Sequence, residues 1–187
     1  WWSYGTSWFD RSGTYAEPLF LQDLQTVQKR YADAGYLQAE IGDPEVLPSP
    51  KGLEVKVRIS EGQRFDVGSI AIAGDETVDV ERLKDRLLLK EGEVFNRSQL
   101  SDSVTLLTEY YTNRGFYFAN VQPISNVSDT EQVVDVIFQV RKGPLYFIRE
   151  IDISGNTITV DSVVRREVEL VEGELYSQRG VMLSRLR

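Results

Sequence analysis

An eleven-residue phrase occurs twice in the chain, and a duplicated unit constrains the fold more than any single residue does. "YADAGYLQAEI" covers Tyr31 to Ile41, and "YTNRGFYFANV" covers Tyr111 to Val121. A second match places "KEGEVF", Lys90 to Phe95, 81 positions before "VEGELY", Val171 to Tyr176. Self-similarity at a fixed period indicates copies of one structural unit, so we predict a tandem array of units about 80 residues long.

Each copy is predicted to open with a strand and a tight turn. Ile70 and Ile72 alternate with smaller residues, and Gly74 follows them. A period of two is typical of a strand, and glycine permits the positive φ of a tight turn. The last copy repeats the pattern and ends it at Gly155. We interpret Gly74 and Gly155 as structural turns, because neither lies in a glycine-rich loop that could bind phosphate.

Two helices are predicted after this turn in the middle copy. The first covers about Val80 to Leu89, and Gly92 is placed to stop it. Asn96 and Gln99 resemble a capping box, which predicts the start of the second helix. One apolar stripe of that helix consists of Leu100, Val104, Leu107 and Tyr111. The first copy has the same stripe in Phe20, Leu24, Val27 and Tyr31.

Glycines are predicted to end both second helices and to lead into the sheet. Gly35 and Gly115 hold the same place in the repeated phrase, and an aromatic residue follows each. We expect the glycine to cap the helix and the aromatic to pack back on the sheet. Strands are then predicted at Tyr117 to Ile124 and Val133 to Val140, joined by the polar "SNVSDTEQ". The predicted fold class is α+β: tandem β-α-α-β-β repeats, each a three-stranded mixed sheet packed on two antiparallel helices.

Three copies account for the whole chain, and one of them is complete. Residues 1–64 are predicted to be a partial copy that lacks its first strand and helix, and residues 65–143 a complete copy. Residues 144–187 are predicted to be a partial copy that stops inside its second helix. The incomplete copies lead us to expect that the chain is a piece of a larger protein.

The composition excludes several classes of function. Lys and Arg number 21 against 29 Asp and Glu, and the net charge of −8 disfavours nucleic acid as a partner. The absence of Cys and His removes thiolate nucleophiles, imidazole bases and the commonest zinc ligands. Acidic pairs such as Glu91 and Glu93 lie in predicted turns without an electrophile or a calcium-binding loop. We therefore expect no enzyme activity, no metal and no cofactor.

The order and spacing of these motifs resemble the POTRA domain, the polypeptide-transport-associated module. "WWSYGTSWFDRSGTY" with "YADAGYLQAEI" is similar to the third POTRA domain of bacterial outer-membrane protein assembly factors. "YFIREIDISGNTITVDSVVRREVELVEGELY" is similar to the fifth, so the complete copy would be the fourth. The resemblance implies a periplasmic array that binds unfolded outer-membrane β-barrel precursors, docks accessory lipoproteins, and continues into its own C-terminal membrane barrel.

The second strand of each repeat is predicted to lie at a sheet edge and to bind a partner. Leu37 to Leu47 contains Pro44 and the next copy contains Pro123, and proline is tolerated on edge strands. The third strands, "LEVKVRI" and "VVDVIFQV", lack proline and are predicted to be central. An open edge can accept an extended peptide by β-augmentation. The expected edge residues are Leu37, Gln38, Ala39, Glu40, Ile41, Phe118, Ala119, Asn120 and Val121.

A second contact is implied by the resemblance to the fifth POTRA domain. Arg165 and Glu172 match positions that the family uses to bind an essential helical-repeat lipoprotein. If the helix runs through Val171, these residues lie two turns apart on one face. The alternative is a solvated charged face, because exposed ion pairs are common and contribute only about 0 to 1 kcal/mol.

Two classes of function remain open from the sequence. The first is a binding module, either in an outer-membrane β-barrel assembly factor or in a related transporter for autotransporter assembly, two-partner secretion or chloroplast import. The second is a purely structural spacer or a divisome-type POTRA protein. Strands of about ten residues with alternating hydrophobicity, following this chain, would indicate a membrane barrel and favour the first class. A single apolar helix before one POTRA domain would indicate the divisome type.

Overall fold

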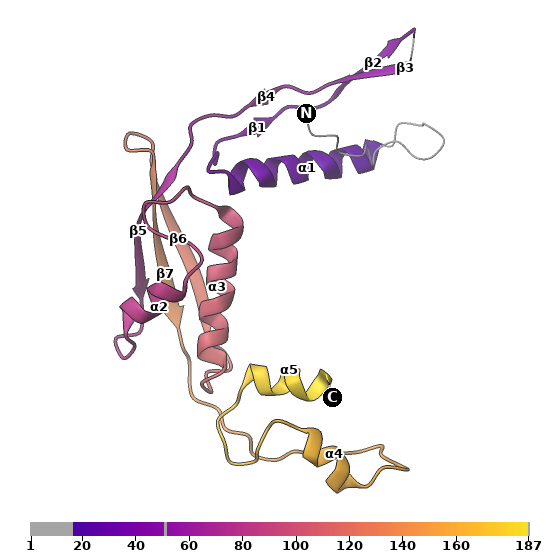
Figure 1. Cartoon of the computed structure of the whole chain (residues 1–187), viewed down its shortest axis with the longest axis vertical. Coiled ribbons are helices and arrows are strands. Elements are labelled where there is room, and N and C mark those ends of the chain that lie inside the picture. The colour runs from indigo at the N-terminus through magenta and orange to yellow at the C-terminus, as the bar shows by residue number, and fades with distance from the viewer. Residues whose placement is uncertain (1–16, 51, 187) are drawn as a thin grey trace.

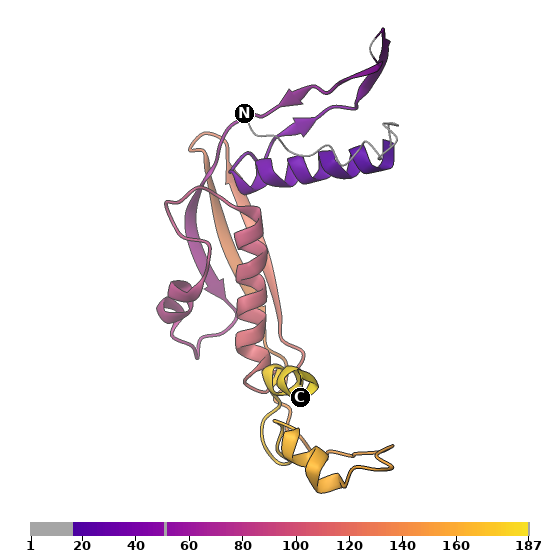
Figure 2. The same ribbon diagram turned by 45° about the vertical axis from the view of Figure 1, so that its right-hand side comes forward.

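The computed structural model describes residues 17–50 and 52–186 (Figure 1). The elements are α1 (Glu17–Asp33), β1 (Glu40–Ile41), β2 (Glu45–Ser49), β3 (Gly52–Lys56), β4 (Ile59–Ser60), β5 (Asp66–Ala73), α2 (Val80–Arg86), α3 (Arg97–Thr112), β6 (Asn120–Ser128), β7 (Val133–Arg141), α4 (Asp161–Glu167) and α5 (Gln178–Leu186). The three repeats follow one another along an extended molecule, with α1, α3 and α5 meeting end to end at bends (Figure 1, Figure 2). Among the described residues, α1 contacts α3 and α3 contacts α5, so contacts between second helices join successive repeats.

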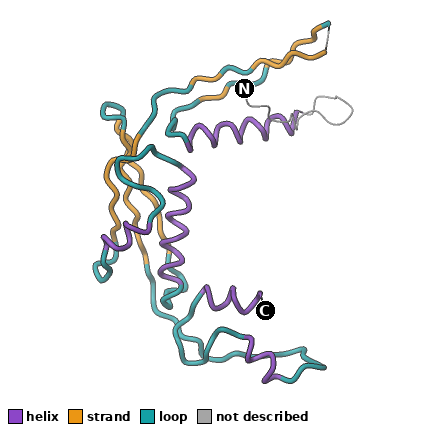
Figure 3. The backbone as a smooth tube through the Cα atoms, viewed as in Figure 1, coloured by secondary structure: helices purple, strands orange, loops and turns teal. Residues whose placement is uncertain are grey.

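The middle repeat confirms the predicted α+β fold class. Its sheet has the order β5-β7-β6, with β5 parallel and β6 antiparallel to β7. Figure 3 shows the strands of this sheet, in orange, beside the long helix α3, in purple. The third strand is central, as its proline-free sequence predicts. Alternate residues of β7 point into a core shared with the two helices. The most buried side chains of that core are Phe65, Val67, Leu87, Leu89, Leu107, Tyr111, Val134, Val136, Phe138 and Val140.

The first helix of this repeat is shorter than predicted. It ends at Arg86 rather than Leu89, because Leu87 adopts an extended backbone with ψ of 146°. Leu87 and Leu89 are then buried in the core, while the amides of Leu88 and Leu89 donate to the hydroxyl of Ser103 on α3. Core burial of these two leucines ends the helix early.

The hairpin of β6 and β7 differs from the prediction at both ends. β6 begins at Asn120 instead of Tyr117 and runs through the first half of the expected polar loop to Ser128. The ladder continues without a break to the pair of Ser128 and Val133. Polar residues are accommodated because this strand is almost wholly exposed, and the turn closes at Gln132 with φ of 56°.

The sheet of the first repeat departs further from the prediction. The expected strand from Leu37 to Leu47 is split into β1 and β2 by residues 42–44, which include Pro44. β1 pairs with β4 and β2 with β3, each as a separate two-stranded sheet. The expected central strand therefore has one partner among the described residues. Residues 1–16 of the predicted first domain lie outside those residues.

The third repeat has no ladder within its described residues, 144–186. Phe147 forms one isolated bridge with Leu175, and residues 150–155 form no strand. This corrects the predicted opening strand of that copy. In the middle repeat the corresponding strand β5 is held by β7, and this 187-residue chain contains no third copy of β7.

Candidate functional site

The outer side of β6 is an open strand edge. β6 pairs with β7 on one side, and no other strand of the described chain pairs with it on the other. Eight of its nine residues are not buried, Val121 being the exception, and the side chains of Ile124 and Val127 are 47% and 48% exposed. An unpaired, exposed edge of this length offers backbone donors and acceptors to an extended peptide.

The opposite edge of the same sheet is covered by the chain itself. The amide of Val67 donates to the carbonyl of Glu93 at 2.7 Å, and the amide of Gly92 donates to the carbonyl of Val67 at 2.8 Å. The side chain of Glu91 accepts the amide of Ile70 at 2.7 Å. These bonds cover the outer side of β5 at Val67 and Ile70, whereas β6 has a strand partner, β7, on one side only within the described chain.

Pro123 indicates which amides of β6 point outward. Proline lacks an N–H and cannot donate to the ladder, so it fits positions whose amide faces away from the neighbouring strand. Backbone orientation alternates along an antiparallel strand. Val121, Ser125 and Val127 share the backbone orientation of Pro123. We infer that their amides point away from β7 and are available as hydrogen-bond donors; we call them the outward amides of β6.

The structure places only some of the predicted edge residues in strands. Glu40 and Ile41 form β1, and Asn120 and Val121 open β6. The remaining predicted residues lie in turns before these strands: Leu37, Gln38, Ala39, Phe118 and Ala119. The turns delay the strands because the amide of each alanine donates to the carbonyl of the aromatic three positions earlier.

Gln38 belongs to a contact between repeats. Its side-chain amide donates to the Asp129 carboxylate at 2.8 Å, where the β6–β7 hairpin turns. This contact makes Gln38 a poor site for testing peptide capture, since its replacement would also disturb the next repeat.

Arg165 and Glu172 form a direct ion pair, although not on one helix. α4 ends at Glu167, and Val168 turns the backbone into an extended conformation. Arg165 Nη1 lies 3.0 Å from Glu172 Oε1, and Arg165 Nη2 donates to the carbonyl of Ile151 at 3.0 Å. Glu172 Oε1 also accepts the amide of Ile151 at 2.9 Å. The condition for placing both residues on one helix face, a helix running through Val171, is therefore not met.

Hydrogen bonding keeps both members of this pair charged. The backbone amide of Ile151, followed by the guanidinium of Arg165, lowers the pKa of the Glu172 carboxyl. Hydrogen bonds to Glu172 and Asp161 raise the pKa of Arg165. Both side chains remain nearly half exposed, at 44% and 45%, so their outer faces are accessible.

The same arrangement occurs in the middle repeat. Lys84 Nζ lies 3.6 Å from Glu91 Oε1, and Glu91 accepts the amide of Ile70. Lys84 and Glu91 stand 81 positions before Arg165 and Glu172. The pair therefore has an internal role in both repeats, because it joins the turn after the first helix to the backbone at Ile70 or Ile151.

A side-chain cap joins the first repeat to the second; we call these contacts the first joint. The carboxylate of Asp33, the last residue of α1, accepts the backbone amide of Ser98 at 2.8 Å and its hydroxyl at 2.9 Å. The carbonyl of Gly35 accepts the amide of Phe65 at 2.9 Å. The first backbone amides of a helix have no hydrogen-bond acceptor within the helix. Asp33, in the preceding repeat, supplies an acceptor for one of these amides in α3.

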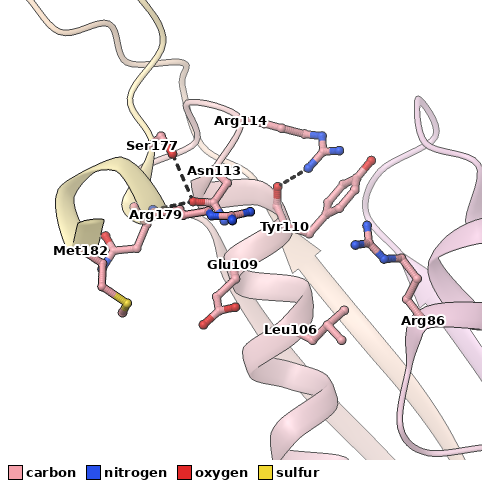
Figure 4. Close-up of a pocket in the computed structure, with 10 residues that line it drawn as sticks. Arg86, Leu106, Glu109, Tyr110, Asn113, Arg114, Ser177, Arg179 and Met182 are labelled. Carbon is pink, nitrogen blue, oxygen red and sulfur yellow. Dashed lines mark hydrogen bonds between the residues drawn. The ribbon is translucent and has the colours of Figure 1, made fainter. Parts of the chain in front are cut away.

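The second joint repeats this geometry between the second and third repeats (Figure 4). Asn113 Oδ1 accepts the amide of Arg179 at 2.7 Å and the hydroxyl of Ser177 at 3.3 Å. The carbonyl of Gly115 accepts the amide of Tyr146 at 2.8 Å. Sequence reasoning missed Asp33 and Asn113, whose signal is a small polar acceptor two positions before the phrase glycine.

The four glycines named from the sequence all have positive φ. The values are 90° at Gly35, 94° at Gly74, 91° at Gly115 and 85° at Gly155. A Cβ added at Gly35 would lie 2.8 Å from the carbonyl oxygen of Phe65. The repeated phrase thus ends a helix and also lets the next repeat approach its backbone closely, which explains why it occurs twice.

The described residues suggest no site for chemistry. No group of three or more Asp and Glu side chains is placed to hold a metal ion there. No helix in residues 17–50 and 52–186 is long and apolar enough to cross a bilayer. The features that remain are the open edge of β6, the ion pair of Arg165 and Glu172, and the two joints.

Comparison with known sequences identifies one family. The model named POTRA, described as surface antigen variable number repeat, matches residues 65–143 and 146–183. The chain is similar to outer membrane protein assembly factor BamA of Nitratidesulfovibrio vulgaris, 28% identical over 91% of this chain, and of Neorickettsia risticii, 32% identical over 84%. These alignments cover 22% and 21% of the relatives, so the chain spans about a fifth of their length.

Solved structures agree with this similarity. The crystal structure of Haemophilus influenzae BamA POTRA3-5 matches with a TM-score of 0.69 and 25% identity, covering 92% of this chain and 69% of that one. BamA from Haemophilus ducreyi lacking POTRA domains 1-3 matches with a TM-score of 0.58 and 28% identity, over 66% of this chain and 24% of that one.

Proposed function

The chain belongs to the POTRA family, and from this we propose that it is the periplasmic part of an outer-membrane protein assembly factor. In this proposal the array receives unfolded β-barrel precursors and passes them to a membrane barrel that forms the C-terminal part of the same protein. It carries no enzyme activity and needs no cofactor. The proposed division into repeats is 1–64, 65–143 and 144–187.

The open edge of β6 is the observation that carries the proposal. A precursor strand that adds to β6 is recognised through main-chain hydrogen bonds, which tolerate many side-chain sequences. The similarity to BamA POTRA3-5 over 92% of the chain supports the same role. β5 is the less accessible edge, because Glu91, Gly92 and Glu93 already bond to its outer side at Val67 and Ile70.

A structural spacer is the second candidate function. The two joints favour it, because each fixes a second helix to the next with a side-chain cap and a backbone hydrogen bond. A spacer needs the joints but not the open edge. A substitution that blocks β6 while leaving both joints intact therefore separates the two candidates.

Ser125→Pro is expected to weaken binding of an extended barrel-strand peptide about tenfold without unfolding the chain. Ser125 is exposed, and its amide is one of the outward amides of β6. Proline therefore removes one donor from the open edge and leaves the hydrogen bonds between β6 and β7 intact. Binding is measured by fluorescence anisotropy of a labelled peptide of about ten residues, the length of one barrel strand.

Ser125→Thr is the matched control, because threonine keeps the amide and suits a strand. Circular dichroism of both variants checks the fold. Wild-type affinity in Ser125→Pro would exclude strand addition at β6 and leave the spacer as the better account.

We further propose that Arg165 and Glu172 dock an accessory lipoprotein of the assembly machine. Glu172→Lys is expected to weaken lipoprotein binding to the full-length protein at low salt by about tenfold, because it reverses a charge that the partner pairs with. The same change also breaks the internal pair, so a control with the same internal effect is needed.

Glu91→Lys is that control, since Glu91 makes the equivalent contacts with Ile70 and Lys84 in the middle repeat. It is expected to leave lipoprotein binding unchanged, as measured by surface plasmon resonance. Equal losses in the two variants would assign the effect to the internal pair and remove the docking site.

A further inference from the structure

A basic groove lies at the second joint, beside the cap formed by Asn113. The hollow has a volume of about 650 Å³ and lies between α3 and the start of α5 (Figure 4). Its lining residues are Arg86, Leu106, Glu109, Tyr110, Asn113, Arg114, Ser177, Gln178, Arg179 and Met182. Three arginines, from α2, from the turn after α3 and from α5, thus line one hollow together with a single carboxylate.

The arginines of this groove are available to a partner. The chain carries a net charge of −8, and its ion pairs use several other basic side chains. Within residues 52–186, no ion pair to an acidic group involves Arg86, Arg114 or Arg179. Unneutralised positive charge in an acidic protein attracts an acidic partner.

Arg114 is held in place before any partner binds. Its guanidinium carbon lies 3.5 Å from the centre of the Tyr110 ring, and its Nη1 donates to the Tyr110 carbonyl at 2.9 Å. Stacking on an aromatic face orients the planar guanidinium and leaves further N–H groups for a carboxylate. Leu106 and Met182 add apolar surface beside it, and Met182 is 56% exposed.

The equivalent wedge at the first joint is also basic. A hollow of about 380 Å³ lies there between α1 and α3, and its charged lining residues are Lys29 and Arg97. Arg97 is the counterpart of Gln178, 81 positions later. The last two strands of the middle repeat, β6 and β7, are present at this joint, and none of their residues lines the hollow. An open basic wedge between successive second helices is thus a recurring feature.

We propose that the groove at the second joint binds an acidic segment of a partner protein. Carboxylates of the segment pair with Arg114, Arg86 and Arg179, and an apolar residue of the segment packs against Leu106 and Met182. Arginine suits this role because its planar fork binds a carboxylate through two parallel hydrogen bonds. The site is separate from the edge of β6 and does not depend on the function proposed above.

The probe is a fluorescein-labelled synthetic peptide of about ten residues with several glutamates and one leucine, a length typical of peptides bound in grooves. Saturable binding to the whole chain is expected at low salt, measured by anisotropy. Arg114→Glu is expected to weaken it at least about tenfold, and Arg114→Lys about threefold, since lysine keeps the charge but loses the fork and the stacking.

The matched control is Arg149→Glu, which makes the same charge change at an exposed arginine outside the groove. It is expected to change binding less than about twofold, the residual effect of net charge. A peptide with glutamine in place of glutamate should not bind. Unchanged circular dichroism of each variant excludes unfolding.

Several results would overturn the proposal. One is the absence of saturable peptide binding to the wild-type chain. Another is an equal loss in Arg114→Glu and Arg149→Glu, which would mean that net charge alone attracts the peptide. Binding to vesicles containing anionic lipid, sensitive to Arg114→Glu in the absence of any peptide binding, would assign the groove to a membrane surface instead. Ser125→Pro must leave peptide binding unchanged, because it tests a different surface.

Discussion

Replacing Gly74 by alanine is expected to unfold the middle repeat in urea concentrations that leave the wild type folded. Gly74 has φ of 94°, which costs other residues about 1 to 2 kcal/mol. Its added Cβ would overlap the backbone oxygen of Val140 and lie 2.8 Å from Nε2 of Gln139. Val140 belongs to the central strand and cannot move away, so overpacking adds about 1 to 3 kcal/mol. Urea unfolding followed by far-ultraviolet circular dichroism measures the loss.

Gly92→Ala separates the two causes of this loss. Gly92 has φ of 78°, but a Cβ there would meet no atom within 4 Å. Its replacement is expected to cost only the conformational part, about 1 to 2 kcal/mol. Similar losses in the two variants would show that the overlap with Val140 is relieved by a small shift of the turn.

Lys142→Met is expected to destabilise the middle repeat by about 2 to 4 kcal/mol at neutral pH. The Asp75 side chain is 1% exposed and lies 2.7 Å from Lys142 Nζ. It also accepts the amide and hydroxyl of Thr77. Removing one partner of a buried ion pair leaves the other charge buried and uncompensated. This destabilises a protein more than replacing both partners by apolar residues does. A quarter of the lysine side chain is exposed, so solvent screens part of the interaction and the loss is smaller than for a fully buried pair.

The pH dependence distinguishes this charge effect from lost packing. Burial alone would raise the pKa of Asp75, but hydrogen bonds from Lys142 and Thr77 outweigh it and hold the pKa at about 2. A lowered pKa stabilises the fold above the unfolded value near 4, and that contribution is lost as the pH falls from about 4 to 2. The difference between wild type and Lys142→Met should therefore be largest above about pH 5 and shrink below pH 4.

Lys84→Met is the control for this experiment. Lys84 is similarly exposed, at 28%, but its partner Glu91 is 52% exposed and already solvated. We expect a loss below about 1 kcal/mol with little dependence on pH. A loss for Lys142→Met that stays constant between neutral pH and pH 3 would contradict the role of Asp75.

The sequence predicts the repeating unit well because the unit is encoded locally. The alternation before Gly74, the stripe ending at Tyr111 and the cap at Asn96 each depend on neighbouring residues. The central place of β7 follows from its apolar, proline-free sequence, and the edge position of β6 from Pro123. These features need no knowledge of the rest of the molecule.

The boundaries and the site were harder to predict, because they depend on contacts distant in the sequence. α2 ends early since Leu87 and Leu89 enter a core closed by α3. Glu172 reaches Arg165 through a turn rather than along a helix, since the amide of Ile151 holds its carboxylate. The joints are not visible in the sequence pattern, because a side chain at the end of one helix accepts a hydrogen bond from the first turn of a helix 65 residues away.

In both caps, the acceptor residue, Asp33 or Asn113, precedes the helix that it caps in the sequence. Each side chain stands at the end of an earlier helix and completes the first turn of a later one. In a chain that emerges with its N-terminus first, the acceptor is in place before the helix that needs it. The first turn is the costly nucleus of a helix, since it fixes several residues for one hydrogen bond. An acceptor held by the preceding repeat lowers that cost, so we expect a folded repeat to assist the start of the second helix in the next one.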